Sequence, residues 1–142
     1  RRELLEEYLL ALIIQSDPGT IIKDEKNFLN EYKFQTLSIY KILDYLKDFL
    51  KHNKTFNQKR FGRLIPSELL KTYDLCFIFP IPKFEDEEHF KEEIEKIRIE
   101  LMTMHIKEKI QILTVKLKEA KDKKEEKDLQ REFSKLVTLL PK

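Results

Sequence analysis

The residues between Glu85 and about Asp122 follow helical spacing without a break, but their apolar face changes partway along. A first apolar stripe comprises Phe90, Ile94, Ile97, Leu101 and Met104. A second stripe comprises Ile99, Met102, Ile106, Ile110, Leu113, Leu117 and Ala120. The two stripes are offset by two residues, or about 200° around a helix of 3.6 residues per turn. The pattern predicts one long helix with packing partners on nearly opposite sides.

We expect the first half of this helix to cover a bundle built from residues 1–83. The second half should pair with a C-terminal stripe formed by Leu129, Phe133, Leu136 and Leu140. At about 1.5 Å per residue the helix spans roughly 55 Å, so its C-terminal half should protrude as an arm. We therefore predict an all-α fold with a helical bundle at residues 1–104 and a protruding C-terminal helical hairpin at residues 105–142. The reversal near Lys121 to Glu125 lacks glycine and proline, which leaves its position open by several residues.

Other helices are predicted at residues 2–15, 36–51 and 66–77, with shorter helical turns at residues 20–24, at 26–32 and before Arg60. Thr36 has the residue type of a helix N-cap. The residues of segment 36–51 expected to face inward are Leu37, Tyr40, Leu43, Leu46, Phe49 and Leu50. Pro80 and Pro82 predict an extended stretch before the long helix.

The composition also favours an all-α protein, because only two of the 142 residues are glycine and 38% are charged. The net charge of +2 does not favour duplex nucleic acid as the main partner. Cys76 is the only cysteine, which suits a buried, inert thiol and a cytoplasmic location. No apolar stretch approaches the about 20 residues that span a membrane. The chain begins with Arg1, and we expect it to be a piece of a longer protein.

The chain offers little for catalysis, and no catalytic residue, metal site or cofactor is predicted for it. Its histidines, His52, His89 and His105, are far apart in the sequence. Asp86 and His89 have the spacing of one carboxylate–histidine pair of a di-iron bundle, but such sites need that pair twice. Acidic residues 85–88 are better explained as a solvated helix start.

Basic and aromatic residues alternate between Lys51 and Arg63, as they do in surfaces that bind single-stranded nucleic acid. In that interpretation the cations are Lys59, Arg60 and Arg63. The alternative is a solvated connection that Phe56 and Phe61 anchor to the core. We favour the connection, because the segment is short and has no sheet to support it.

The predicted hairpin carries more apolar residues than its internal seam can bury. Ile112, Val115, Val137 and Leu139 lie off the seam, and Leu140 lies at its end. Exposed apolar clusters often mark binding sites. We predict that these residues contact a partner protein, with Lys116 and Lys135 among the lysines around them. The alternatives are an arm folded back on the bundle and simple scattered exposure.

The chain resembles, over nearly its whole length, the C-terminal helicase-binding domain of bacterial DnaG-type DNA primases. The resemblance rests on RELLEEYLLALIIQ at residues 2–15 followed by Pro18, on the acid-led long helix, and on LKEA and DLQREFSKL at residues 117–120 and 128–136. The sequence differs from the usual pattern in two places. Its turn at residues 121–125 lacks the common glycine, and its link at residues 76–84 is rich in phenylalanine.

The resemblance implies a non-catalytic domain whose hairpin docks on the hexameric DnaB-type replicative helicase and recruits primase for RNA primer synthesis during DNA replication. The polymerase chemistry would belong to upstream parts of a longer primase. The fragment is expected to be monomeric, without a membrane partner and with weak or indirect contact to nucleic acid. Two alternatives remain: the N-terminal collar domain of the helicase itself, which is related in fold, and a helical module that binds single-stranded nucleic acid.

Overall fold

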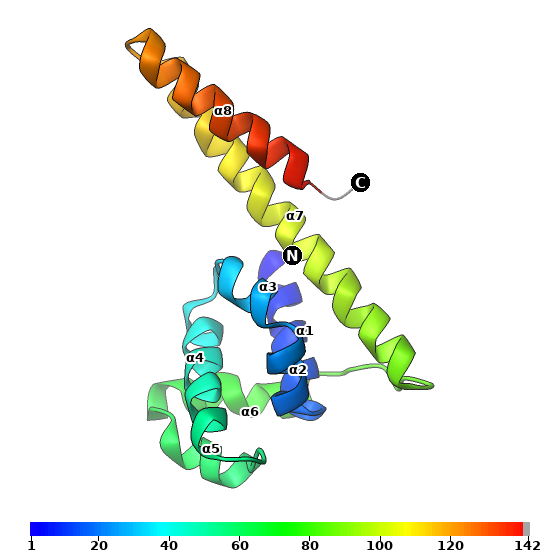
Figure 1. The fold of residues 1–142 in the computed structure, drawn as a ribbon. Coiled ribbons are helices and arrows are strands. Elements are labelled where there is room, and N and C mark those ends of the chain that lie inside the picture. The colour runs from blue at the N-terminus through cyan, green and yellow to red at the C-terminus, as the bar shows by residue number, and fades with distance from the viewer. Residues whose placement is uncertain (141–142) are drawn as a thin grey trace. The chain divides into compact units, whose positions relative to one another are not determined.

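A computed structural model of the protein describes residues 1–140. The structure is 80% helical, and the described residues contain no β-strand (Figure 1). The predicted all-α fold class is therefore confirmed. The chain divides into two compact units, Arg1–Ile97 and Arg98–Lys142, and the boundary falls inside the long helix. The predicted boundary lay slightly later, between residues 104 and 105. Residues 141 and 142 of the predicted hairpin lie outside the described residues.

The first unit is built around α1 (Arg2–Gln15). Six consecutive residues of this helix, Leu9 to Ile14, are buried, because α1 packs against three other helices. These are α2 (Pro18–Asp24), α4 (Leu37–His52) and α6 (Leu70–Ile78). The remaining short elements are α3 (Lys26–Glu31), α5 (Gln58–Leu64) and a 3₁₀ turn at Ser67–Leu69.

The start of α4 is held by a residue from another helix. Thr36 occupies the N-cap position, as predicted, but its side chain makes no capping hydrogen bond. Instead, the carboxylate of Glu6 in α1 accepts hydrogen bonds from the backbone N–H groups of Gln35 (2.9 Å) and Thr36 (2.9 Å). Because α4 begins with a positive dipole end, a carboxylate is well placed there. Glu6 thus joins α1 to α4.

Glu6 also binds the phenol of Tyr32, whose hydroxyl donates to the Glu6 carboxylate over 2.5 Å. The Arg2 side chain donates in turn to the Tyr32 hydroxyl and to the Lys33 carbonyl oxygen. Burial raises the pKa of Tyr32, and the hydrogen bond to Glu6 raises it further, although Arg2 opposes the shift. The fully buried carboxylate therefore has several partners, as a buried charge requires.

The inward face of α4 differs from the predicted one at two positions. Leu37 and Tyr40 are 63% and 52% exposed, whereas Ile39 and Ile42 are fully buried. At about 100° per residue, Leu37 lies roughly 160° around the helix from Ile39. The prediction grouped Leu37 with Leu43 and Leu46 and overlooked that the buried stripe is centred on Ile39.

The segment predicted as one helix at residues 66–77 begins as the 3₁₀ turn and becomes α6 at Leu70. Pro66 precedes the turn with extended backbone, so it ends the preceding connection and does not occupy the first helical position. Residues 80–84 have no regular secondary structure, at the place where the two prolines predict an extended stretch. They lead to α7 (Glu87–Glu119), which is the predicted long helix.

In the unit Arg98–Lys142, the second part of α7 is followed by a link at residues 120–122 and by α8 (Lys123–Leu139). The link is so short that α8 runs back along α7, antiparallel to it (Figure 1). Asp122 caps α8, because its side chain accepts a hydrogen bond from the Glu125 N–H over 2.7 Å. The chain therefore reverses between α7 and α8 without a glycine, with Asp122 as the cap of α8.

Candidate protein-binding surface

The hairpin of α7 and α8 has a thin apolar seam. On α7, Leu113 is buried and Ile110 and Leu117 are half-buried. On α8, Leu129, Phe133 and Leu136 are half-buried, and none of the residues of Lys123–Leu139 is fully buried. A two-helix unit has little interior, so its apolar residues keep much of their surface in water.

Besides Ile99, which is 41% exposed, four large apolar side chains of the described part of this unit are exposed. The exposed fractions are 49% for Ile112, 51% for Val115, 44% for Val137 and 62% for Leu139. These are the off-seam residues that we predict to contact a partner. Leu140 is half-buried just beyond the end of α8, and Lys116 and Lys135 are exposed.

Helix geometry divides the four residues into two groups. Ile112 and Val115 are three residues apart on α7, and they lie about 100° and 160° around the helix from Leu113. They therefore form one patch on the outer side of α7. We call this pair the α7 outer patch.

Val137 and Leu139 lie near the end of α8. Because they are two residues apart, their side chains point about 160° away from each other, on opposite flanks of the hairpin. In an antiparallel pair with so short a link, they lie beside residues 103–105 of α7. That position is roughly 12–16 Å along the helix from the α7 outer patch. The structure therefore does not bring all four residues into a single patch.

The basic residues assigned to nucleic acid lie on α5, and Lys59, Arg60 and Arg63 are all exposed. The aromatic residues beside them are engaged elsewhere. The Phe61 ring is 1% exposed, packed 5.5 Å from the ring of Phe49 and 5.3 Å from that of Tyr73. Phe56 packs on the same cluster. These rings anchor the connection to the core and leave no open stacking platform next to the cations.

Asp86 and His89 form a helix cap. The Asp86 carboxylate accepts a hydrogen bond from the His89 N–H over 2.8 Å and lies 2.7 Å from the His89 ring nitrogen Nδ1. The backbone hydrogen bond, followed by the one to the ring, lowers the pKa of Asp86. Within residues 1–140, no group of three or more His, Cys, Asp or Glu side chains is arranged to hold a metal ion.

Cys76 is buried, as predicted, and its thiol donates to the Thr72 carbonyl oxygen within α6. Burial, with a smaller contribution from the charge of Glu7, raises its pKa to about 12. Such a thiol remains protonated at neutral pH and is a poor nucleophile.

A second exposed apolar area lies in the first unit, and the sequence pattern does not single it out. Leu75 and Ile78 of α6 are 49% and 75% exposed beside a cavity of about 330 Å³. The hydroxyl of Thr36 lies at this cavity, buried and without a hydrogen-bond partner. In the sequence, Leu75 and Ile78 flank Cys76, which is buried. Their spacing alone does not separate a buried face from an exposed one.

None of the helices in the described part of the chain is long and apolar enough to cross a membrane. Comparison with protein families, with curated proteins and with solved structures finds no match for this chain.

Proposed function

We propose that this chain is a non-catalytic helicase-binding module that recruits a bacterial primase to the replicative, DnaB-type helicase. The observation that carries the proposal is the exposure of Ile112, Val115, Val137 and Leu139 on a hairpin too thin to bury them. The choice of helicase as the partner rests on the sequence resemblance. Burying such side chains against another protein gains about 25 cal/mol for each Å² removed from water.

The proposed module acts by raising a local concentration. A primase polymerase attached to this chain would be held close to freshly unwound template whenever the hairpin binds the helicase. A short flexible tether gives an effective concentration in the millimolar range, which can exceed the free concentration of the enzyme. The module therefore needs no catalytic group of its own.

The narrow hairpin suits a small, reversible interface. Lys116 and Lys135 are exposed on it and would steer the approach to an acidic surface. Because such steering is screened by salt, association should slow as the ionic strength rises, whereas the apolar contacts should depend on salt only weakly.

The test uses two double variants, because the apolar residues fall into two groups. Ile112→Asp with Val115→Asp alters the α7 outer patch, and Val137→Asp with Leu139→Asp alters the end of α8. We expect at least one of them to weaken binding to the purified hexameric helicase by roughly thirtyfold or more, as loss of a binding hot spot does. Helical circular dichroism should stay unchanged, because all four side chains are exposed.

A matched control is Gln130→Asp with Ser134→Asp. Both residues are exposed on α8, and the variant adds the same charge without removing an apolar contact. It should bind the helicase like the wild type in calorimetry or co-elution. If both apolar variants keep wild-type affinity, the hairpin is not the interface and the proposal fails. If the control loses binding equally, the apolar side chains are not the cause.

Solution mass separates this proposal from the helicase collar domain, to which the resemblance also extends in fold. Light scattering at micromolar concentration should give the mass of one chain, near the 17.3 kDa of the sequence. A stable self-assembly would favour the collar domain instead, because that domain's role is to join subunits.

A further inference from the structure

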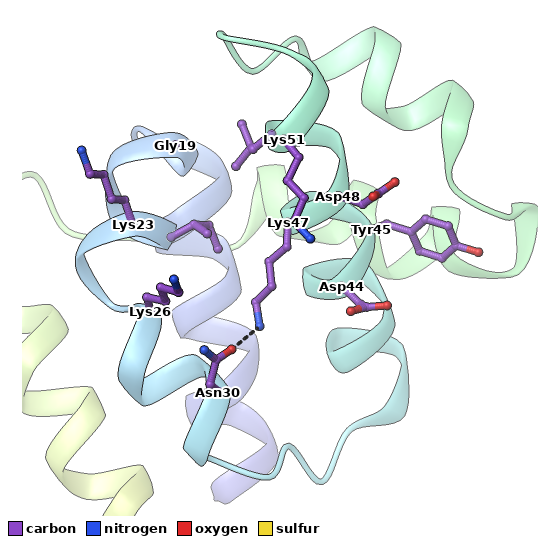
Figure 2. Close-up of a pocket in the computed structure, with 11 residues that line it drawn as sticks. Gly19, Lys23, Lys26, Asn30, Asp44, Tyr45, Lys47, Asp48 and Lys51 are labelled. Carbon is purple, nitrogen blue, oxygen red and sulfur yellow. Dashed lines mark hydrogen bonds between the residues drawn. The ribbon is translucent and has the colours of Figure 1, made fainter.

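The first unit contains a groove unrelated to the hairpin. It lies between α2–α3 on one side and α4 on the other, with a volume of about 790 Å³ (Figure 2). Four lysines line it: Lys23 from α2, Lys26 from α3, and Lys47 and Lys51 from α4. The groove therefore collects positive charge from three helices.

The ammonium groups of these lysines are not neutralised by carboxylates. Lys47 donates to the Asn30 side-chain oxygen over 3.4 Å, and none of the four has an ion pair among the described residues. Asp44 and Asp48 also line the groove, but Figure 2 shows their carboxylates directed away from α2–α3. Asp48 lies 3.9 Å from the His52 ring instead. Like charges that share a groove repel each other, and a bound anion would relieve that repulsion.

The kind of anion follows from the groups that are present. The described lining contains no arginine, whose planar fork would grip a single phosphate or carboxylate with two hydrogen bonds. Gly19 does not form a close phosphate cradle, because a Cβ at that position would meet only ordinary contacts, the nearest at 3.7 Å. Separate lysine charges on both sides of a groove are better suited to successive phosphates of a chain than to one small anion.

The groove would not recognise the bases of such a nucleic acid. Tyr45 is the aromatic residue of the lining, and Figure 2 shows its ring on the side of α4 away from Lys26 and Asn30. Base recognition in single strands relies on stacking on aromatic rings. Binding through this groove should therefore be independent of sequence.

We propose that the groove between α2–α3 and α4 binds the phosphate backbone of single-stranded nucleic acid through Lys23, Lys26, Lys47 and Lys51. This site is distinct from the basic residues of α5 and does not depend on a helicase partner. It would let the module hold an unwound strand while another surface contacts a protein.

Fluorescence anisotropy with a labelled single-stranded 20-mer, titrated at several KCl concentrations, tests the proposal. Each phosphate contact contributes about −0.7 to the slope of log K against log salt, so four contacts give a slope of roughly −3. Lys47→Gln with Lys51→Gln should make the slope shallower by about 1.4. Each substitution should also weaken binding by roughly two- to fivefold, the range for one exposed charge pair.

Two further variants sharpen the test. Asp44→Asn with Asp48→Asn removes negative charge from the groove and should strengthen binding, which damage to the fold would not do. Lys71→Gln with Lys83→Gln changes the net charge as much as the Lys47 and Lys51 pair, at exposed positions outside the groove, and should have little effect.

Three results would overturn the proposal. Wild-type affinity and salt slope in the Lys47 and Lys51 variant would show that the groove does not bind the strand. Loss of binding in Lys59→Gln with Arg60→Gln, and not in the groove variant, would place the site on α5. Tighter binding of inorganic tripolyphosphate than of the oligonucleotide would show a small-anion site instead.

Discussion

Glu6 shows how much one buried carboxylate can organise at the scale of a residue. Its oxygens accept hydrogen bonds from the N–H groups of Gln35 and Thr36 and from the Tyr32 hydroxyl. The three donors come from the connection between α3 and α4, which has no regular structure of its own. A charged acceptor makes shorter and stronger hydrogen bonds than a neutral one, so Glu6 fixes where α4 begins.

Replacing this carboxylate should strongly destabilise the first unit. Glu6→Ala leaves two backbone N–H groups and a phenol without their acceptor, and we expect a loss of about 3–5 kcal/mol in the free energy of unfolding. Urea denaturation followed by circular dichroism measures it. Glu3→Ala, at an exposed position of the same helix, should change stability by less than about 0.5 kcal/mol. Equal stabilities for the two variants would refute the capping role of Glu6.

At the scale of an element, α4 shows what determines which face of a helix is buried. Ile39, Ile42 and Leu46 are all fully buried, whereas Leu37 is 63% exposed although it is equally apolar. Position around the helix, and not residue type, decides between them. A stripe of alternating three- and four-residue steps can be started from either Leu37 or Ile39, and only contact with α1 and α6 selects one.

The two positions should respond differently to the same kind of truncation. Ile39→Ala removes buried methyl and methylene groups and should cost about 2–5 kcal/mol of unfolding free energy. Leu37→Ala removes an exposed side chain and should change stability by less than about 0.5 kcal/mol. Thermal or urea unfolding of both variants provides the comparison. A large loss in the Leu37 variant would mean that its side chain is covered in solution.

At the scale of the whole molecule, the two units differ in how they use apolar residues. The unit Arg1–Ile97 has a buried core, with rings such as Phe49, Phe61 and Tyr73 packed together. In the described part of the unit Arg98–Lys142, α7 buries Leu101, Ile106 and Leu113, but no residue of α8 is buried. Stability should therefore reside mainly in the first unit, and the second is better suited to exchange its contacts with water for contacts with a partner.

The buried thiol of that core gives the molecule a pH dependence. The pKa of Cys76 rises from its ordinary value of 9.0 to about 12 in the folded state, chiefly because burial disfavours the thiolate. Its contribution to stability is thus fully present below about pH 9 and is lost as the pH rises towards 12. Urea denaturation at pH 8 and pH 11 should show lower stability at the higher pH. Cys76→Ser, which has no thiol to ionise, should lose less stability over that interval. An identical loss in both proteins would contradict this assignment.

The local sequence was enough to locate the main helices and to show that the chain reverses after the long helix. The two offset stripes on α7 predicted a helix observed as Glu87–Glu119, and the prolines predicted the break in helical structure before it. Local interactions suffice for this, because helical periodicity and backbone restrictions act between near neighbours in sequence.

Only the tertiary structure decided which faces are buried and which distant residues meet. It placed Glu6 at the start of α4 and exposed Leu37. It also gathered Lys23, Lys26 and Lys47 around one groove from three separate helices, where the sequence had singled out the basic run on α5. Such arrangements depend on contacts between segments far apart in the chain. No local pattern encodes them, because a charge or an apolar side chain looks the same in sequence whether packing covers it or leaves it in water.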